Sequence, residues 1–262
     1  MVCSTVTRTL ALMALPVGLV VYGCADSDGQ AGENGSVRFS QVLDYGETDD
    51  FTAPIAAGRP IFLALQHPKE GFLDDETYAE LTLRVERDDG SEIDAVWPFG
   101  FAQYGLRLED PGDYWLLAER DGVQVDALKV QVQRVDHIVL SDQIQIKTTY
   151  DSGTESCSRF EEVDGISQVT LHKNQRLEFF VVPQNSAGEP MLGLLALTAV
   201  APDSVQLDAP LFGQGRRANA LSVLPTSALP ERIMMSIEDQ DSGDLIELDF
   251  AASNEDMVLN CD

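Results

Sequence analysis

The chain has 262 residues, of which 44 are acidic and only 17 are Lys or Arg, so its formal net charge is −27. A protein this acidic repels phosphate backbones and anionic lipid surfaces, because binding to either relies on clustered Lys and Arg. The charge therefore argues against nucleic acid as a partner. The carboxylates are scattered over predicted strands and turns and form no single block, which is typical of a solubilising surface.

An apolar segment opens the chain. Arg8 is its single cation, an apolar run of about 13 residues follows from Leu10 to Tyr22, and Val21-Tyr22-Gly23-Cys24 leads into a polar, acidic stretch. This arrangement resembles a bacterial lipoprotein signal, in which a peptidase cuts ahead of the cysteine and the thiol receives a diacylglycerol. The resemblance implies that residues 1–23 are removed and that Cys24 becomes the lipidated first residue. A membrane-spanning helix would need roughly 20 apolar residues, so the run is too short for one.

The resemblance also implies a location. Acyl chains such as palmitate would anchor the protein to a membrane of the bacterial cell envelope, effectively permanently. In enterobacteria Asp directly after the lipidated cysteine retains a lipoprotein in the inner membrane; Ala25 stands there in this chain, which favours the outer membrane. The alternative is cleavage by the ordinary signal peptidase, since Gly23 and Ala25 are both small, and its product would be a soluble secreted protein. Either cleavage removes Arg8 and leaves 16 basic against 44 acidic residues, a charge of −28.

The mature chain of roughly 239 residues is long enough for two domains of common size. Residues 24–36 contain small, acidic and Gly residues without a large apolar side chain, which predicts a flexible tether. We place the first domain at residues 37–136 and the second at residues 137–262.

Short β-type segments separated by turns fill the first domain, and no stretch has a sustained helical apolar stripe. In Tyr78–Glu86 the apolar Leu81, Leu83 and Val85 alternate with polar residues, as in a half-buried strand. Asp121-Gly122 tolerates positive φ and predicts a hairpin between Asp113–Arg120 and Val123–Val135. Strands predicted in the second domain are Val169–Leu171, Leu177–Pro183, Leu194–Ala201, Val205–Leu207, Ile233–Ile237 and Leu245–Ala251. The pattern predicts an all-β chain built of antiparallel sandwiches.

The segment Leu106-Arg-Leu-Glu-Asp-Pro-Gly-Asp-Tyr114 resembles the corner between strands E and F of immunoglobulin-like bacterial domains. In that family Pro-Gly turns the chain and a tyrosine hydroxyl bonds back to upstream backbone, roles that fall here on Pro111, Gly112 and Tyr114. Trp97 is a candidate for the buried tryptophan of such a sandwich. Asn185–Pro190 resembles the "D-x-x-G-x-P" loop of bacterial immunoglobulin-like repeats, with Asn185 in place of the acid. The resemblance implies two immunoglobulin-like antiparallel β-sandwich domains.

The cysteines predict one disulfide. Cys3 is discarded with the signal and Cys24 would be acylated, which leaves Cys157 and Cys261 as the thiols of an exported protein. In an oxidising compartment an intrachain disulfide between them is expected.

Catalytic patterns are weak, so we expect no enzyme. His67, His137 and His172 stand far apart without the local spacing of a zinc site. A Cys157–His172 nucleophile pair is a poorer explanation of Cys157 than a disulfide, and no G-x-S-x-G elbow occurs. Residues 213–217 hold two glycines and two arginines, but no strand and helix flank them as a phosphate cradle requires.

The best candidate for a cofactor site is Asp239-Gln-Asp241-Ser-Gly-Asp244. Asp239, Asp241 and Asp244 could supply three oxygens to calcium, or the segment could simply be a turn between two strands. No metal other than calcium and no organic cofactor is expected.

These features predict a lipid-anchored, non-enzymatic binding or structural module of the cell envelope, with an unidentified protein or glycan as its partner. The aromatic segment from Trp97 to Tyr104 is the first place to look for that partner's site. Two alternatives remain: an assembly or chaperone subunit that presents a sheet edge to client proteins, and a hydrolase whose site is formed by residues distant in sequence. Because sandwich folds host many functions, this function is inferred by analogy with the fold.

Overall fold

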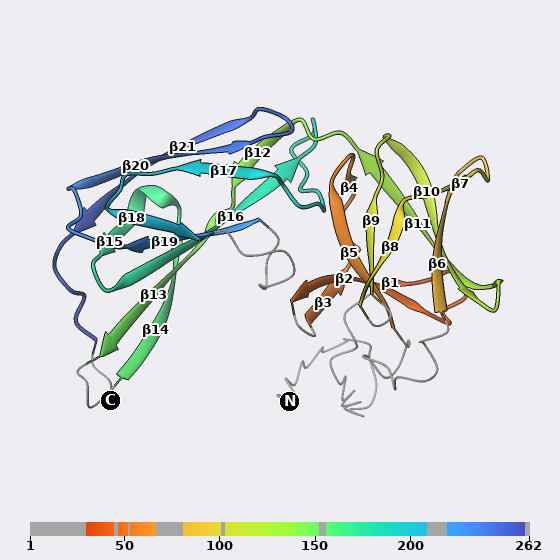
Figure 1. Cartoon of the computed structure of the whole chain (residues 1–262), viewed down its shortest axis with the longest axis horizontal. Coiled ribbons are helices and arrows are strands. Elements are labelled where there is room, and N and C mark those ends of the chain that lie inside the picture. The colour runs from red at the N-terminus through yellow and green to blue at the C-terminus, as the bar shows by residue number, and fades with distance from the viewer. Residues whose placement is uncertain are drawn as a thin grey trace, which may run out of the picture.

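A computed structural model describes residues 30–44, 47–51, 53–66, 81–100, 103–151, 156–208 and 219–259. Within these ranges the regular structure is almost entirely β-strand, and the one helical element is a single 3-10 turn, η1 (Ile166–Gln168). The all-β prediction is therefore confirmed. No helix in the described ranges is long and apolar enough to cross a membrane. The strands form two groups that meet at an angle (Figure 1).

The first group forms an immunoglobulin-like sandwich. Its strands are β1 (Gln30–Ala31), β2 (Arg38–Asp44), β3 (Glu47–Asp50), β4 (Ile55–Ala56), β5 (Pro60–Gln66), β6 (Leu81–Arg87), β7 (Glu92–Ile93), β8 (Val96–Gly100), β9 (Gln103–Arg107), β10 (Gly112–Arg120) and β11 (Val123–Gln133). One sheet has the order β1-β2-β5-β9-β8, with β3 on β2, and the other the order β4-β11-β10-β6-β7. With β2, β5, β9 and β8 as strands A, B, E and D, and β11, β10 and β6 as G, F and C, this is the immunoglobulin arrangement.

The second group repeats this strand order. Its strands are β12 (His137–Leu140), β13 (Gln143–Asp151), β14 (Ser156–Asp164), β15 (Thr170–His172), β16 (Gln175–Gln184), β17 (Leu197–Val200), β18 (Val205–Asp208), β19 (Ala220–Pro225), β20 (Arg232–Asp239) and β21 (Leu245–Ser253). β12 and β13 both pair with β16 and together act as strand A, so A-B-E-D is β12/β13-β16-β19-β18. The facing sheet is β15-β21-β20-β17, and β14 is an extra strand beside β13. The prediction of two immunoglobulin-like sandwiches is confirmed.

Alternating apolar residues build two separate cores. The buried members of one core lie between residues 37 and 132, and those of the other between residues 138 and 250. In β6, Leu81, Leu83 and Val85 point into the first core while Thr82 is exposed, as the alternation predicts. Burying one such side chain stabilises the fold by about 1.5–3 kcal/mol.

Tyr114 lies near the start of β10, at the predicted corner. Its side chain is 2% exposed, and its hydroxyl donates a hydrogen bond of 2.7 Å to the backbone carbonyl of Asp110. Gly112 has a φ of 151°, which a residue with a side chain rarely adopts. Burial raises the pKa of Tyr114 above its usual value, and the Arg87 guanidinium lies 6.0 Å from the ring centroid.

The flexible tether predicted for residues 24–36 is wrong over its second half. β1 pairs with β2, and the carboxylate of Asp126, which is fully buried, accepts the N–H groups of Asn34 (2.8 Å), Ser36 (2.7 Å) and Val37 (2.8 Å). Backbone donors satisfied by a buried carboxylate are strongly held. The composition of residues 24–36 does not indicate this order, because Asp126, which accepts the hydrogen bonds, lies about 90 residues downstream. Residues 24–29, including Cys24, lie outside the described residues.

The interpretation of Trp97 as the buried sandwich tryptophan is also wrong. Trp97 lies on β8, the strand-D edge, and is 38% exposed. Its ring covers Gly105 on β9, where an added Cβ would lie only 2.1 Å from the ring. The buried tryptophan of this fold belongs on strand C, and β6, which occupies that position, contains none.

We predict that Tyr114→Phe lowers the free energy of unfolding of the first sandwich by about 1–3 kcal/mol, because the Asp110 carbonyl, in a part-buried hydrogen bond, loses its donor. Both tryptophans of the chain, Trp97 and Trp115, lie in this sandwich, so urea unfolding followed by tryptophan fluorescence reports on it. Tyr150→Phe, at a 39% exposed position in the second sandwich, should leave the transition unchanged. An unmoved midpoint for Tyr114→Phe would contradict the corner assignment.

Candidate functional site: the junction between the two sandwiches

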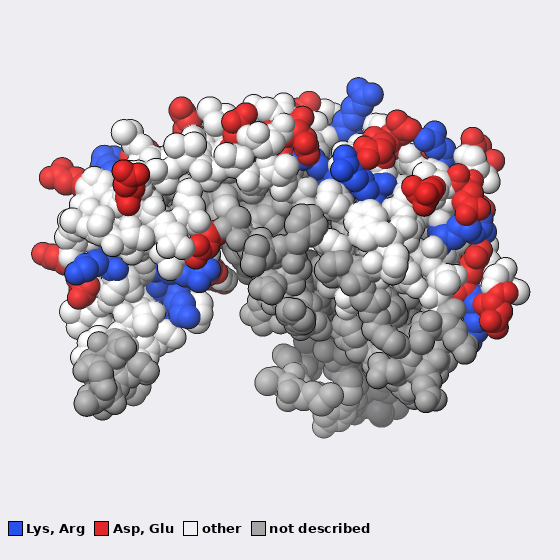
Figure 2. Space-filling model, in the orientation of Figure 1, with Lys and Arg blue, Asp and Glu red and all other residues white. Residues whose placement is uncertain are grey.

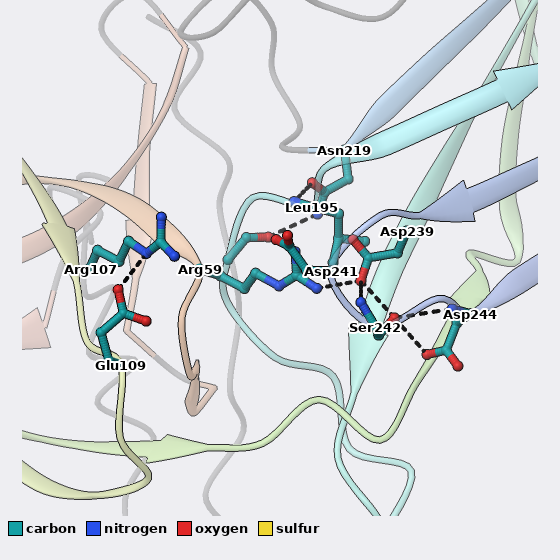
Figure 3. A network of polar contacts seen from close by, with 10 residues as sticks. Arg59, Arg107, Glu109, Leu195, Asn219, Asp239, Asp241, Ser242 and Asp244 are labelled. Atoms are coloured by element: carbon teal, nitrogen blue, oxygen red, sulfur yellow. Dashed lines mark hydrogen bonds and ion pairs between the residues drawn. The ribbon is translucent and has the colours of Figure 1, made fainter.

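A network of polar contacts joins the two sandwiches (Figure 3). A segment of the second sandwich, residues 190–195, runs beside β4 of the first. The Leu192 N–H donates to the Pro54 carbonyl (2.8 Å), and the Ala56 N–H donates to the Leu192 carbonyl (2.7 Å). Ile55 and Leu192 thus form a parallel bridge, and the Leu192 side chain packs on the first core. The second sandwich therefore completes an open sheet edge of the first.

Gly193 permits this close approach. Its φ is 155°, and a Cβ added to it would lie 2.8 Å from the Cβ of Arg59 and 3.0 Å from the Cβ of Ala56. The first distance is shorter than real Cβ contacts and the second is tighter than most of them, so a residue other than glycine would force the two sandwiches to shift apart locally.

Asn219 holds the same segment to the second sandwich. Its Oδ1 accepts the Leu195 N–H (2.6 Å), and its Nδ2 donates to the Gly193 carbonyl (3.0 Å). Asn219 itself has a φ of 65°, a conformation that asparagine accepts more readily than most residues. Residues 193–195 are thus fixed on one side by a side-chain amide and on the other by the backbone of the first sandwich.

Arg59 forms the ion pairs that cross the junction. It lies between β4 and β5, is 4% exposed, and its guanidinium forms ion pairs with Asp239, which is fully buried, and with Asp241, which is 59% exposed. Asp239 is the last residue of β20 and Asp241 lies in the turn that follows, about 180 residues away in sequence. The Ser242 hydroxyl lies 2.7 Å from Oδ2 of Asp239 and 3.1 Å from Asp244, which orders the turn.

A buried ion pair contributes little net stability, because desolvation of both charges offsets their attraction. Removing one partner is a different matter, since it leaves the other charge buried and uncompensated at a cost of about 3–5 kcal/mol. Arg59 and Asp239 can therefore satisfy each other in only one relative orientation of the sandwiches. The pair acts as a device that fixes the junction geometry.

Asn185 adds a further polar link. Its side chain is buried, and its Nδ2 donates to Oε1 of Gln133 on β11 (2.7 Å) and to Oε2 of Glu189 (2.8 Å), while its Oδ1 accepts the N–H of Glu189 (3.0 Å). An aspartate could not donate to either partner and would face the Glu189 carboxylate. The junction thus gives a physical reason for Asn185 in a loop where the resembling family has an acid.

The three aspartates considered as calcium ligands serve this junction. Asp239 and Asp241 face the Arg59 guanidinium, and Asp244 contacts Ser242 (Figure 3). Across the part of the chain that the structure describes, no three His, Cys, Asp or Glu side chains are grouped so that they could hold a metal ion. Of the two interpretations of this segment, the arrangement favours the turn between two strands.

The other residues singled out by sequence lie apart. Cys157 is on β14 and is disulfide-bonded; Cys261 lies outside the described residues, so its pairing with Cys157 stays a prediction. The His137 ring nitrogen is 3.2 Å from Asp136, and that of His172 is 3.2 Å from the Glu255 carbonyl. His67 and residues 213–217 also lie outside the described residues.

A second candidate surface is a depression of about 450 Å³ beside the tyrosine corner. Its lining combines the exposed Trp97 ring with two ion pairs, Arg87–Asp110 (2.6 Å) and Arg107–Glu109 (2.8 Å). An aromatic face beside orientable donors and acceptors suits a polar ligand or a side chain of another protein. The depression contains the first residue of the aromatic segment that the sequence pointed to.

No family model and no curated protein matches the chain. Among solved structures it is similar to domains 4 and 5 of the S-layer protein SbsC (10% identity, TM-score 0.28, 81% of this chain and 94% of that one). A tandem of titin immunoglobulin domains is similar at 7% identity (TM-score 0.27, 78% and 92%), and the Escherichia coli adhesin FdeC at 13% (TM-score 0.27, 87% and 66%). The immunoglobulin-like assignment rests on the strand order of the chain itself.

We predict that Gly193→Ala opens the junction, since the new methyl group would overlap Arg59 and Ala56; such overpacking typically costs about 1–3 kcal/mol. In hydrogen–deuterium exchange, the amides of Ala56 and Leu192 should lose protection. Gly188→Ala is the matched control, because Gly188 also has a positive φ (78°) but no atom lies within 4 Å of the place that its new methyl group would occupy. Equal loss of protection in both variants would attribute the effect to backbone strain.

Proposed function

We propose that the chain is a lipid-anchored, non-enzymatic binding or structural module of the bacterial cell envelope, which presents two immunoglobulin-like sandwiches at a fixed angle. The observation that carries the proposal is the junction. Domains in one chain move relative to each other unless their interface resists it. Here backbone pairing, a required glycine and a buried ion pair all resist it.

A fixed angle suits a protein that spaces or binds other molecules. Binding surfaces held in one relative position lose less conformational freedom when a partner docks, so more of the contact energy appears as affinity. The visible face carries carboxylates over both sandwiches with cations interspersed, which fits a surface kept soluble outside its contact sites (Figure 2). The depression beside Trp97 is the binding surface that we favour for a protein or glycan.

The lipid anchor at Cys24 would hold the first sandwich close to its membrane. Because β1 begins at Gln30, only five residues separate it from Cys24. Even fully extended, this stretch spans at most about 20 Å. We infer attachment to the outer membrane from Ala25. Such a short linker would keep the two sandwiches near the membrane surface.

A second candidate function is an assembly or chaperone subunit. The observation that favours it is β14, a nine-residue strand at the edge of its sheet, because client proteins are bound through such edges.

We predict that Cys24→Ala leaves an unprocessed precursor without acyl chains, because the thiol that receives the diacylglycerol is gone. Metabolic labelling with a fatty-acid probe and an electrophoretic size shift measure the two effects. Cys3→Ala, which alters only the discarded segment, should label normally. Efficient labelling of Cys24→Ala would exclude the lipoprotein assignment.

We predict that Arg59→Ala converts the fixed angle into a flexible one. Burying Asp239 without its partner would cost about 3–5 kcal/mol, and undocking relieves this cost while each core stays folded. Small-angle scattering should show a broader distance distribution with an unchanged circular dichroism spectrum. Arg107→Ala is the control, because Arg107 pairs with Glu109 at a site where both are more than half exposed. An unchanged scattering profile for Arg59→Ala would remove the main support for a rigid module.

A further inference from the structure

β14 is the one long sheet edge in the described residues without a proline, a glycine or a bulge, and charged side chains are its only protection. It pairs with β13 through nine residues on one side, and no described strand pairs with its other side. The remaining edges are short or blocked. β7 has two residues and β17 and β18 four each; β8 contains Pro98 and a register shift, and β4 is covered by Leu192. Such devices prevent association between edges, and β14 has no proline, glycine or bulge.

The sequence of β14 is complementary to itself. In an antiparallel pair, directly opposite residues point to the same face of the sheet. Two copies of β14 related by a two-fold axis perpendicular to the sheet must therefore be centred on a residue. Centred on Phe160, Arg159 lies opposite the partner's Glu161, Glu161 opposite the partner's Arg159, and the two Phe160 rings face each other.

The neighbouring registers are disfavoured by charge. Centring the pair on Arg159 would oppose two guanidinium groups, and centring it on Glu161 would oppose two carboxylates. Like charges directly opposite are destabilising, whereas opposite charges and aromatic pairs stabilise antiparallel strands. Only the Phe160 register provides both kinds of favourable pair.

The side chains are accessible for this pairing. Phe160 is 60% exposed, with the Lys147 ammonium 5.4 Å from its ring centroid, and Arg159 and Glu161 are exposed and form no ion pair with any described residue. An exposed phenylalanine between a cation and an anion of this kind is unusual on so acidic a surface. We propose that β14 pairs antiparallel with β14 of a second copy of this chain, centred on Phe160, so that one sheet runs through a symmetric dimer. Such an interface uses the same patch on both copies. The proposal does not depend on the function proposed above.

Disulfide trapping of the full-length chain tests the register. In the dimer the two Phe160 Cα atoms would be about 4.5–5.5 Å apart, within reach of a disulfide. Phe160→Cys should therefore form a covalent dimer on a non-reducing gel. Glu162→Cys is the control: position 162 lies opposite the partner's Ser158, which leaves the two copies of residue 162 about 13 Å apart. We expect at least tenfold more dimer from Phe160→Cys, and equal yields would overturn the register.

Charge exchange tests the interface without new cysteines. Light scattering of the detergent-solubilised full-length chain, at physiological ionic strength to screen repulsion between two chains of charge −27, measures the dimer fraction. Arg159→Glu and Glu161→Arg should each weaken dimerisation about tenfold or more, because each opposes like charges. The double exchange restores opposite charges and should restore the dimer, which a folding defect would not do. A wild-type chain that remains monomeric at about 100 µM, or a double exchange without rescue, would overturn the proposal.

Discussion

The ion pair between Arg59 and Asp239 is the interaction on which the arrangement of the molecule depends. Each sandwich has its own apolar core and could bury those residues without the other. Arg59 and Asp239 differ from the core residues because each needs the other sandwich. Each is almost fully buried, and its partner in the ion pair belongs to the other sandwich. The cost of leaving either charge unpaired exceeds what most surface contacts provide. The ion pair therefore sets the relative orientation of the sandwiches. The apolar cores keep each sandwich folded.

The contacts around this pair point to the same geometry. Leu192 can extend the β4 edge only if Gly193 lies within contact distance of Arg59. On the opposite side, the Asn219 side chain donates a hydrogen bond to the Gly193 carbonyl. The backbone pairing is independent of side-chain identity, whereas the ion pair is not, so together they fix both translation and rotation. Asn185 and Gln133 add a neutral hydrogen bond to the same interface, next to the β4 edge. Agreement between contacts of different chemistry is what distinguishes a rigid junction from a chance surface contact.

Features whose cause is local could be predicted from the sequence. The alternation of Leu81, Leu83 and Val85 identified β6, and the Pro-Gly-Asp-Tyr corner located Tyr114, because both depend on residues a few positions apart. The strands β12, β13, β14 and β19 were not predicted. Whether a segment of mixed polar and apolar residues forms a strand depends on the residues that pack against it in the fold, and these cannot be read from the segment itself. Arg59 gave no signal, since its partner lies about 180 residues away. The order of residues 30–36 was missed for the same reason, as the carboxylate of Asp126 that holds them is about 90 residues distant.

The two sandwiches handle exposed strand edges in one consistent way. Where an edge meets another part of the chain it is paired, as β4 is by Leu192, and where it faces solvent it is, with the exception of β14, short or interrupted by proline. Excess negative charge adds a general barrier to association, because any two copies repel each other over the Debye length. Against that background only a surface with local charge compensation can bring copies together. β14 contains a cation and an anion placed symmetrically about an aromatic residue, so the acidity that suppresses unspecific contacts also makes this one edge selective for its own copy.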